Sequence, residues 1–212
     1  SLYLTHLSKN SKISTLRRRL VSISMVHKLK GHYLDTKHPI IVENLMGIKR
    51  ANGSIQKGKK PILINHLKSI INVIDKQKIE YIKKSRDKTI ILIGFGGGFR
   101  RSELISIDYE DLEFVTEGLK ITIRRSKTDQ FGEGMIKGLP YFNNENYCPV
   151  TNLKKWLEIS KINSGPIFRR FSKGSFLTER RLTDQSVVLL MKEYLNLAGI
   201  ENKNFAGHSL RA

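Results

Sequence analysis

Apolar residues recur at helical spacing along most of the chain. In residues 14–23, STLRRRLVSI, they follow a 3.6-residue period, with Ser14 as a capping residue before them and Gly31 to end the run. This pattern predicts a helix from Ser14 to about Gly31. A second short apolar period predicts another helix over residues 41–48.

After Pro61 the pattern changes from helices to a hairpin and back to helices. A continuous apolar run at Thr89–Phe95 predicts a buried helix that starts near Ser85. Alternating apolar and polar residues over 119–125, with a second predicted strand at 135–139, predict an antiparallel hairpin, whose connection is longer than the tightest turns. The remaining predicted elements are helices at 62–74, 102–107, 151–160 and 183–198. The predicted fold class is mainly α with a small antiparallel β-sheet, that is, α+β.

Residues 50–60, RANGSIQKGKK, separate the two parts of this pattern. The segment contains glycines, polar residues and four basic residues, and it has no apolar period. Such a composition is typical of a flexible linker. The chain is therefore predicted to consist of an N-terminal helical domain over residues 1–49, a basic linker over 50–60 and a second domain over 61–212.

Positive charge is concentrated near the N-terminus. The chain of 212 residues carries 38 Lys and Arg against 19 Asp and Glu, a net charge of +19. Residues 1–74 hold fourteen of the basic and two of the acidic residues, so twelve of the net charges lie there. This surplus favours a polyanionic partner, nucleic acid first, although charge alone does not exclude a merely basic protein.

Several other classes of function are disfavoured by the sequence. No apolar run approaches the roughly eighteen residues of a membrane span, and no secretory leader pattern is present, so a cytoplasmic, nucleoid-associated protein is expected. Cys148 is alone, which leaves it as a small packed side chain. The glycines of GFGGG, residues 94–98, lack the Gly-Lys-Ser/Thr of a phosphate loop, and Phe99 stands where a dinucleotide motif has glycine. They are expected to end a helix and to turn Arg100 into a cleft.

Residues 98–112, GFRRSELISIDYEDL, strongly resemble the first catalytic motif of the tyrosine recombinases of the phage integrase family. In that motif, Gly-x-Arg-x-Ser-Glu-Leu presents an arginine at a helix start. The resemblance implies that Arg100 is the first catalytic arginine and that Glu103 is a carboxylate that supports the site. It also implies that residues 61–212 are a catalytic domain, incomplete at its C-terminus, and residues 1–49 a core-binding (SAM-like) domain, incomplete at its start.

Two further motifs occur in the order that the family shows. RRSKTDQ, residues 124–130, resembles the second motif, in which a lysine between two strands reaches the cleaved phosphate, and this implies Lys127. GHSLRA resembles the His-x-x-Arg motif and implies His208 and Arg211. Each motif alone is weakly specific, but together they are strong. STLRRRLVSI, CPVTNLKKWL and GPIFRR also resemble the family, so the resemblance runs from about residue 3 to the last residue.

These residue types suit attack on a phosphodiester. Arg100 and Arg211 would hold the non-bridging oxygens, because a guanidinium is always charged and matches two oxygens. His208 would hydrogen-bond the phosphate or help to move a proton. The resemblance makes Lys127 the general acid for the departing 5′ oxygen, since a desolvated ammonium can titrate. The carboxylates do not have the spacing of a two-metal nuclease, so no metal and no cofactor is expected.

The nucleophile of the family has no counterpart in these residues. By resemblance a tyrosine attacks the phosphate and forms a 3′-phosphotyrosyl link, but Tyr194, the last tyrosine, precedes the His-x-x-Arg motif. Tyr194 is therefore expected to be a packing or surface residue. The chain is expected to be truncated before the nucleophile, and so to bind DNA without cleaving it. A type IB topoisomerase-like relaxase and a non-catalytic integrase remnant remain as alternatives.

Double-stranded DNA is the partner that the resemblance implies. It would pass between two domains that form a C-shaped clamp, and the full-length protein would act as a tetramer, whereas a truncated chain can be a monomer. Basic residues of the first helix, of the linker and of the second motif are expected to contact DNA. They are Arg17, Arg18, Arg19, Lys57, Lys59, Lys60, Arg124 and Arg125.

Overall fold

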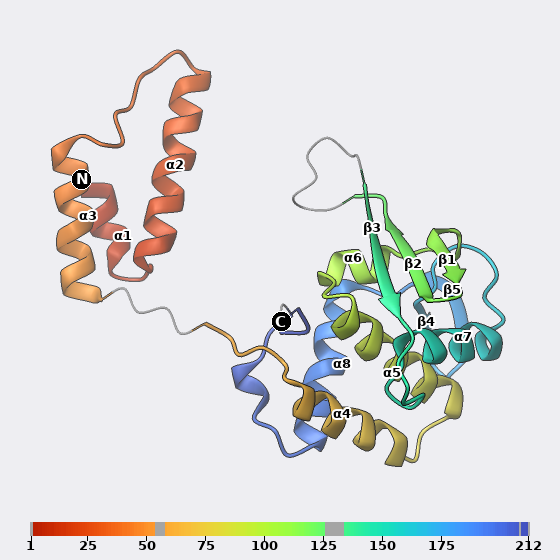
Figure 1. The fold of residues 1–212 in the computed structure, drawn as a ribbon. Helices are drawn as coiled ribbons and strands as arrows, with labels where there is room; N and C mark the ends of the chain where they lie inside the picture. Colours follow the sequence, from red (N-terminus) through yellow and green to blue (C-terminus); the bar gives the residue numbers. More distant parts are fainter. Residues whose placement is uncertain (1, 54–57, 126–133, 208, 212) are drawn as a thin grey trace. The chain divides into compact units, whose positions relative to one another are not determined.

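The computed structural model describes residues 2–53, 58–125, 134–207 and 209–211, and the chain divides into two compact units (Figure 1). The first unit spans Ser1–Gly58 and the second spans Lys59–Ala212. Each has its own hydrophobic core. The fold class is confirmed: the described residues are mainly helical, with small antiparallel sheets.

The first unit consists of three helices, α1 (Leu2–Ser8), α2 (Ile13–Leu29) and α3 (Pro39–Asn52). Six buried residues form its core: Leu4, Ile13, Leu16, Leu20, Leu45 and Ile48. The predicted cap at Ser14 was wrong, because the buried side chain of Ile13 extends the apolar stripe and α2 begins there, with Lys12 before it. The predicted end is confirmed, since Gly31 has a φ of 76°.

The two units divide between Gly58 and Lys59, within the predicted linker of residues 50–60, and regular contacts extend into that segment from both sides. Helix α3 continues through Asn52, so Arg50 is helical. At the other end, the Lys60 amide donates to the Asn204 carbonyl at 2.7 Å, which ties Lys60 into the second unit. The backbone thus leaves less room for a linker than the composition suggested.

The second unit is built around α5 (Tyr81–Gly96), which is buried along its second half. Its residues Ile90, Ile91 and Ile93 are fully buried, as the continuous apolar run predicted. Helices α4 (Ile64–Lys76) and α7 (Pro149–Ser160) pack against it, and α6 (Arg101–Ser106) and α8 (Asp184–Leu197) also contact it. Two short 3-10 helices of this unit are Tyr109–Asp111 and Asn202–Asn204.

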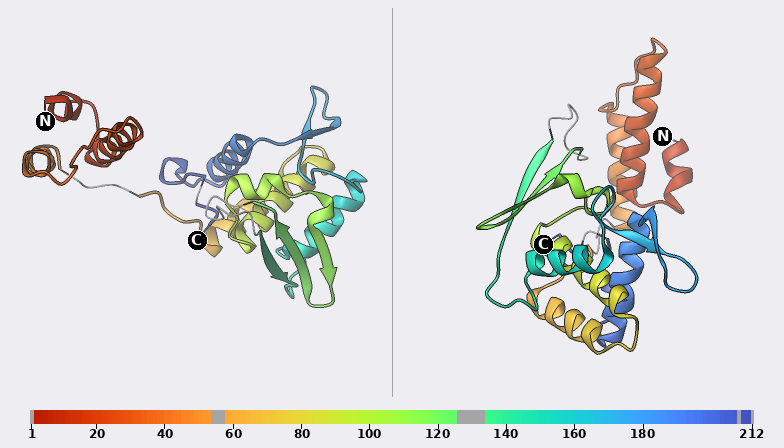
Figure 2. Two further views of the ribbon diagram at one scale, coloured as in Figure 1. Left: turned by 90° about the horizontal axis from the view of Figure 1, so that it is seen from above. Right: turned by 90° about the vertical axis from the view of Figure 1, so that its right-hand side faces the viewer.

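A three-stranded antiparallel sheet lies at one side of these helices (Figure 2). Its strands are β1 (Leu112–Val115), β2 (Gly118–Ile123) and β3 (Met135–Pro140), in that order. The predicted hairpin of β2 and β3 is confirmed. The sequence did not predict β1 or the second hairpin, β4 (Arg169–Phe171) and β5 (Leu177–Arg181), because these strands are short.

Trp156, Cys148 and Tyr194 are core residues. Trp156 is fully buried and its indole Nε1 donates to the Ile167 carbonyl at 2.8 Å, so it anchors the core. Cys148 is fully buried, in agreement with a packed side chain. Tyr194 is buried in α8, and its hydroxyl donates to Asp87 Oδ2 at 2.8 Å. Among the described residues, no helix is both long and apolar enough to span a membrane.

Candidate active site

The glycines at the end of α5 form the sharp turn that the sequence predicted. A Cβ on Gly97 would lie 2.1 Å from the ring of Phe99, so a side chain does not fit there. Gly98 has a φ of 54°, in the left-handed region that favours glycine. The turn directs Phe99 into the core, where it is 2% exposed, and places Arg100 at the N-cap of α6.

Arg100 is held by a buried carboxylate, that of Glu103. The Arg100 amide donates to Glu103 Oε2 at 2.9 Å, and its guanidinium Nη1 donates to Oε1 at 2.5 Å. The Glu103 side chain is 3% exposed and that of Arg100 is 18% exposed. A carboxylate that binds both the backbone and the side chain of one residue fixes its rotamer, so Arg100 is positioned before any ligand arrives.

The third motif packs against the first. Arg211 Cγ lies 3.9 Å from the position that a Cβ on Gly98 would take. A Cβ on Gly207 would lie 2.3 Å from the Arg101 side chain, so the backbone of residue 207 lies directly against α6. Leu210 is buried in the main core. The chain thus brings the two predicted arginines, Arg100 and Arg211, to the same end of α5.

A lysine that the sequence analysis did not single out lies beside these arginines. Lys137 on β3 donates from Nζ to the carbonyl oxygens of Gly97 at 2.8 Å and Gly98 at 3.2 Å. Burial lowers the pKa of Lys137 below its ordinary value; Glu103 opposes this shift, and the nearby charges of Arg211 and Arg100 add to it. Strand periodicity was the signal that could have found it, because Lys137 shares a face with buried Leu139.

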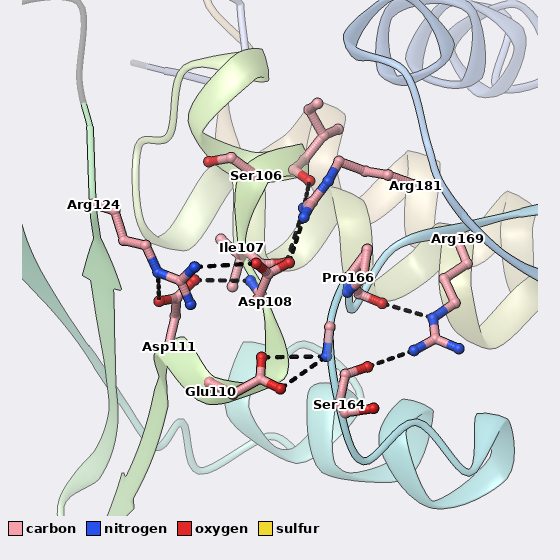
Figure 3. A network of polar contacts seen from close by, with 12 residues as sticks. Ser106, Ile107, Asp108, Glu110, Asp111, Arg124, Ser164, Pro166, Arg169 and Arg181 are labelled. Atoms are coloured by element: carbon pink, nitrogen blue, oxygen red, sulfur yellow. Dashed lines mark hydrogen bonds and ion pairs between the residues drawn. The ribbon is translucent and has the colours of Figure 1, made fainter.

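A second polar network lies at the other end of α6 (Figure 3). Asp108 Oδ1 accepts a hydrogen bond from Arg181 of β5, and Asp108 Oδ2 lies 3.4 Å from Arg124 Nη1. Arg124 Nε also donates to Asp111 Oδ1 at 2.7 Å. The network joins the end of β2 to β5 and to the turn after α6. Arg124 was predicted to contact DNA. Its side chain is 58% exposed, but it already pairs with the carboxylates of Asp108 and Asp111.

The other predicted residues fall into two groups. Lys127, His208 and Lys57 lie outside the described residues. Arg17, Arg18, Arg19, Lys59, Lys60 and Arg125 are exposed, and Lys59 Nζ donates to the Lys203 carbonyl at 2.5 Å. Within the described ranges, no group of three or more His, Cys, Asp and Glu residues lies close enough together to hold a metal ion.

Residues 62–212 match the model of the phage integrase family. The chain is 39% identical to an integrase/recombinase XerD homolog of Selenomonas ruminantium over 99% of this chain and 61% of that protein. It is 23% identical to the tyrosine recombinase XerC of Caldanaerobacter subterraneus subsp. tengcongensis over 92% of this chain and 44% of that protein. The chain therefore belongs to the phage integrase family of tyrosine recombinases, and it spans less than two thirds of the length of these relatives.

Solved structures show the same fold. Lambda integrase (residues 75–356) bound to DNA has a TM-score of 0.56 at 15% identity, over 98% of this chain and 66% of that one. The XerH site-specific recombinase in its pre-cleavage complex with difH substrate has a TM-score of 0.54 at 18% identity, over 96% and 58%. At these identities the likeness supports the fold.

Proposed function

We propose that this chain is the DNA-binding and phosphate-activating part of a site-specific recombinase that cleaves and rejoins DNA strands. The observation that carries the proposal is the pair Arg100–Glu103 beside Arg211, in a chain that belongs to the phage integrase family. Among the structures that share the fold, lambda integrase was solved bound to DNA and XerH was solved bound to its difH substrate. Double-stranded DNA is therefore the proposed partner.

The two arginines would neutralise the phosphate that is attacked. Each guanidinium can donate two parallel hydrogen bonds to non-bridging oxygens, and both remain charged at any working pH. Because Glu103 holds Arg100 in place, little reorganisation is needed when charge develops in the pentavalent transition state. Such preorganised charge is the largest contribution that these described residues would make to the rate.

Residues outside the described part complete the proposed reaction. Lys127 would protonate the departing 5′ oxygen, and His208 would hydrogen-bond the phosphate or move a proton. A tyrosine outside these 212 residues would attack the phosphorus and form a 3′-phosphotyrosyl bond, which conserves the energy for rejoining. The mechanism needs neither ATP nor a metal ion.

The exposed arginines of the first unit would supply affinity rather than chemistry. Arg17, Arg18 and Arg19 are all exposed residues of α2. Contacts to phosphates release counterions and fix the protein on the duplex without reading its sequence. The full-length protein is proposed to act as a tetramer on paired sites.

The test is formation of a covalent complex by the full-length protein on a nicked duplex that carries its recombination site. The proposal predicts a complex that survives denaturing electrophoresis, forms in the presence of a chelator and is digested to a phosphotyrosyl peptide. DNA binding without any covalent complex would instead support a non-catalytic remnant. Relaxation of supercoiled plasmids without regard to sequence would support a topoisomerase-like enzyme.

A further inference from the structure

Lys137 makes its contacts with the machinery that holds Arg100, and none of the catalytic motifs accounts for it. Its ammonium donates to the carbonyl oxygens of Gly97 and Gly98, the two glycines that form the turn before Arg100. It lies 4.0 Å from Glu103 Oε2 and 4.4 Å from the centre of the Phe99 ring. We propose that Lys137 is a positioning residue for Arg100, which it keeps in place by tying this turn and Glu103 to β3.

The carbonyl oxygens of this turn accept hydrogen bonds from the ammonium of Lys137, and an apolar side chain could not donate them. Helix ends leave carbonyl oxygens without helical partners, and a cation near them is favourable. The Gly98 carbonyl belongs to a residue with a positive φ, at the point where the chain leaves the helical path of α5. The ammonium of Lys137 supplies a fixed point for this turn from a neighbouring strand.

Lys137 also acts on the buried carboxylate. Glu103 accepts from the amide and the guanidinium of Arg100, and its Oε2 faces Lys137. A second cation near this buried carboxylate offsets part of the cost of removing its charge from water. Arg211 is the other charged group near Lys137 and disfavours its ammonium, as Arg100 does. The lysine thus holds its charge through Glu103 and the two carbonyls.

These contacts distinguish Lys137 from a proton donor. Its ammonium donates to the carbonyl oxygens of Gly97 and Gly98, and it lies 4.0 Å from Glu103 Oε2 and 4.4 Å from the centre of the Phe99 ring. The side chain is 21% exposed. Its donors are therefore directed into the protein, and its effect on the reaction passes through Arg100.

The inference rests on the proposed function, and the test uses the full-length protein. Lys137→Met removes the ammonium and keeps the length, and Lys137→Arg restores a cation. Lys120→Met on the neighbouring strand is the matched control, because Lys120 pairs with exposed Glu113 and contacts no part of the site. We expect Lys137→Met to lower the single-turnover cleavage rate at saturating protein by about 10- to 100-fold with little change in the Kd for DNA. Lys137→Arg should recover part of this loss, and Lys120→Met should cleave at the wild-type rate.

A double-substitution cycle separates positioning from a general loss of structure. If Lys137 acts through Glu103, the combination Glu103→Gln with Lys137→Met should be slower than Glu103→Gln alone by no more than about threefold. Fully multiplicative losses would overturn the proposal, as would Lys137→Met at the wild-type rate.

Hydrogen exchange gives a reading that does not depend on cleavage. In the full-length protein, the amides around Arg100 should exchange about tenfold faster in Lys137→Met than in Lys120→Met. Equal exchange in the two variants would refute the positioning role even if cleavage fell. If the wild-type protein forms no covalent complex, the recombinase proposal fails, while faster exchange would still support the role of Lys137 in fixing Arg100.

Discussion

The two units hold their positive charge in different ways. Among the described residues of the first unit, no lysine or arginine forms a salt bridge, whereas the second unit fixes Arg86, Arg100, Arg124 and Arg181 on buried or partly buried carboxylates. Exposed charge attracts a polyanion at many orientations and is screened by salt. Charge fixed by a carboxylate has one geometry. Under the proposed function, the first unit would supply affinity for DNA and the second unit the chemistry.

The hydrophobic cores of the two units also differ, and the second unit has the larger one. The first unit buries six apolar residues, and several large apolar residues of α2, such as Leu29 at 80% and Val21 at 62%, remain exposed. The second unit packs α5 against α4, α6, α7 and α8 and has a much larger core. A large rigid core is what allows a short turn such as Gly97–Gly98 to place a side chain to within a fraction of an ångström.

The largest effect is expected in the core of the second unit. Ile70→Ala on α4 removes a fully buried side chain and should lower the free energy of unfolding of this unit by about 3 kcal/mol. Ile64→Ala on the same helix is the control, because Ile64 is 60% exposed, and it should cost less than about 0.5 kcal/mol. Chemical denaturation measures both. Similar losses in the two variants would show that the core does not carry the stability of the second unit.

The fixed charge itself is tested by Glu103→Gln. The variant leaves Arg100 with a neutral partner, and cleavage by the full-length protein should fall by about 100-fold at saturating DNA. Glu113→Gln, whose side chain is 63% exposed, should have no effect. Single-turnover cleavage on a nicked duplex provides the rates, and an unchanged rate in Glu103→Gln would remove the basis for preorganisation.

The exposed charge of the first unit is tested by replacing Arg17, Arg18 and Arg19 with alanine. Affinity for duplex DNA should fall by roughly tenfold, and the slope of log K against log salt should decrease by up to about three, because each of these arginines can neutralise one phosphate. The same three positions changed to lysine should keep most of the slope. Binding isotherms at several salt concentrations measure this. A steep slope that survives in the alanine variant would place the DNA-binding charges elsewhere.

The smallest effect is expected for the buried pair formed by Tyr194 of α8 and Asp87 of α5. Tyr194→Phe removes a hydrogen bond to Asp87 and should cost about 1 to 2 kcal/mol near neutral pH. Burial and the charge of Asp87 raise the pKa of Tyr194. The unfolded chain therefore ionises first, above pH of about 10, and the wild-type advantage should shrink as the pH rises beyond it. Tyr81→Phe is the control, because Tyr81 is 67% exposed. A gap that stays constant up to high pH would contradict the raised pKa.

The sequence predicted elements best where a period was long. The helix around Thr89–Phe95 and the hairpin of β2 and β3 could be predicted, because a buried helix requires a continuous apolar run and a half-buried strand requires alternating apolar residues. Short strands such as β4 carry too few residues for a period. The N-cap of α2 lies at Lys12, two residues before the predicted Ser14, because the packing of Ile13 in the core extends the helix beyond the capping residue.

Arg100, its supporting carboxylate Glu103 and Arg211 were predicted from the motifs, whereas Lys137 was not. Arg100, Glu103 and Arg211 stand in recognisable patterns, and the structure brings them to one end of α5. Lys137 is distant in sequence from the turn that it holds, and a lysine on a short strand is ordinarily a solvent-facing residue. Contacts between segments far apart in the chain need the fold before they can be inferred.

The separation of chemistry from affinity is tested most directly by Arg100→Lys in the full-length protein. Lysine keeps the charge but lacks the planar fork that binds two phosphate oxygens. The rate of covalent complex formation at saturating DNA should fall by about 100-fold or more, while the Kd for DNA should change by less than about threefold. Cleavage near the wild-type rate, or a loss confined to the Kd, would contradict this separation.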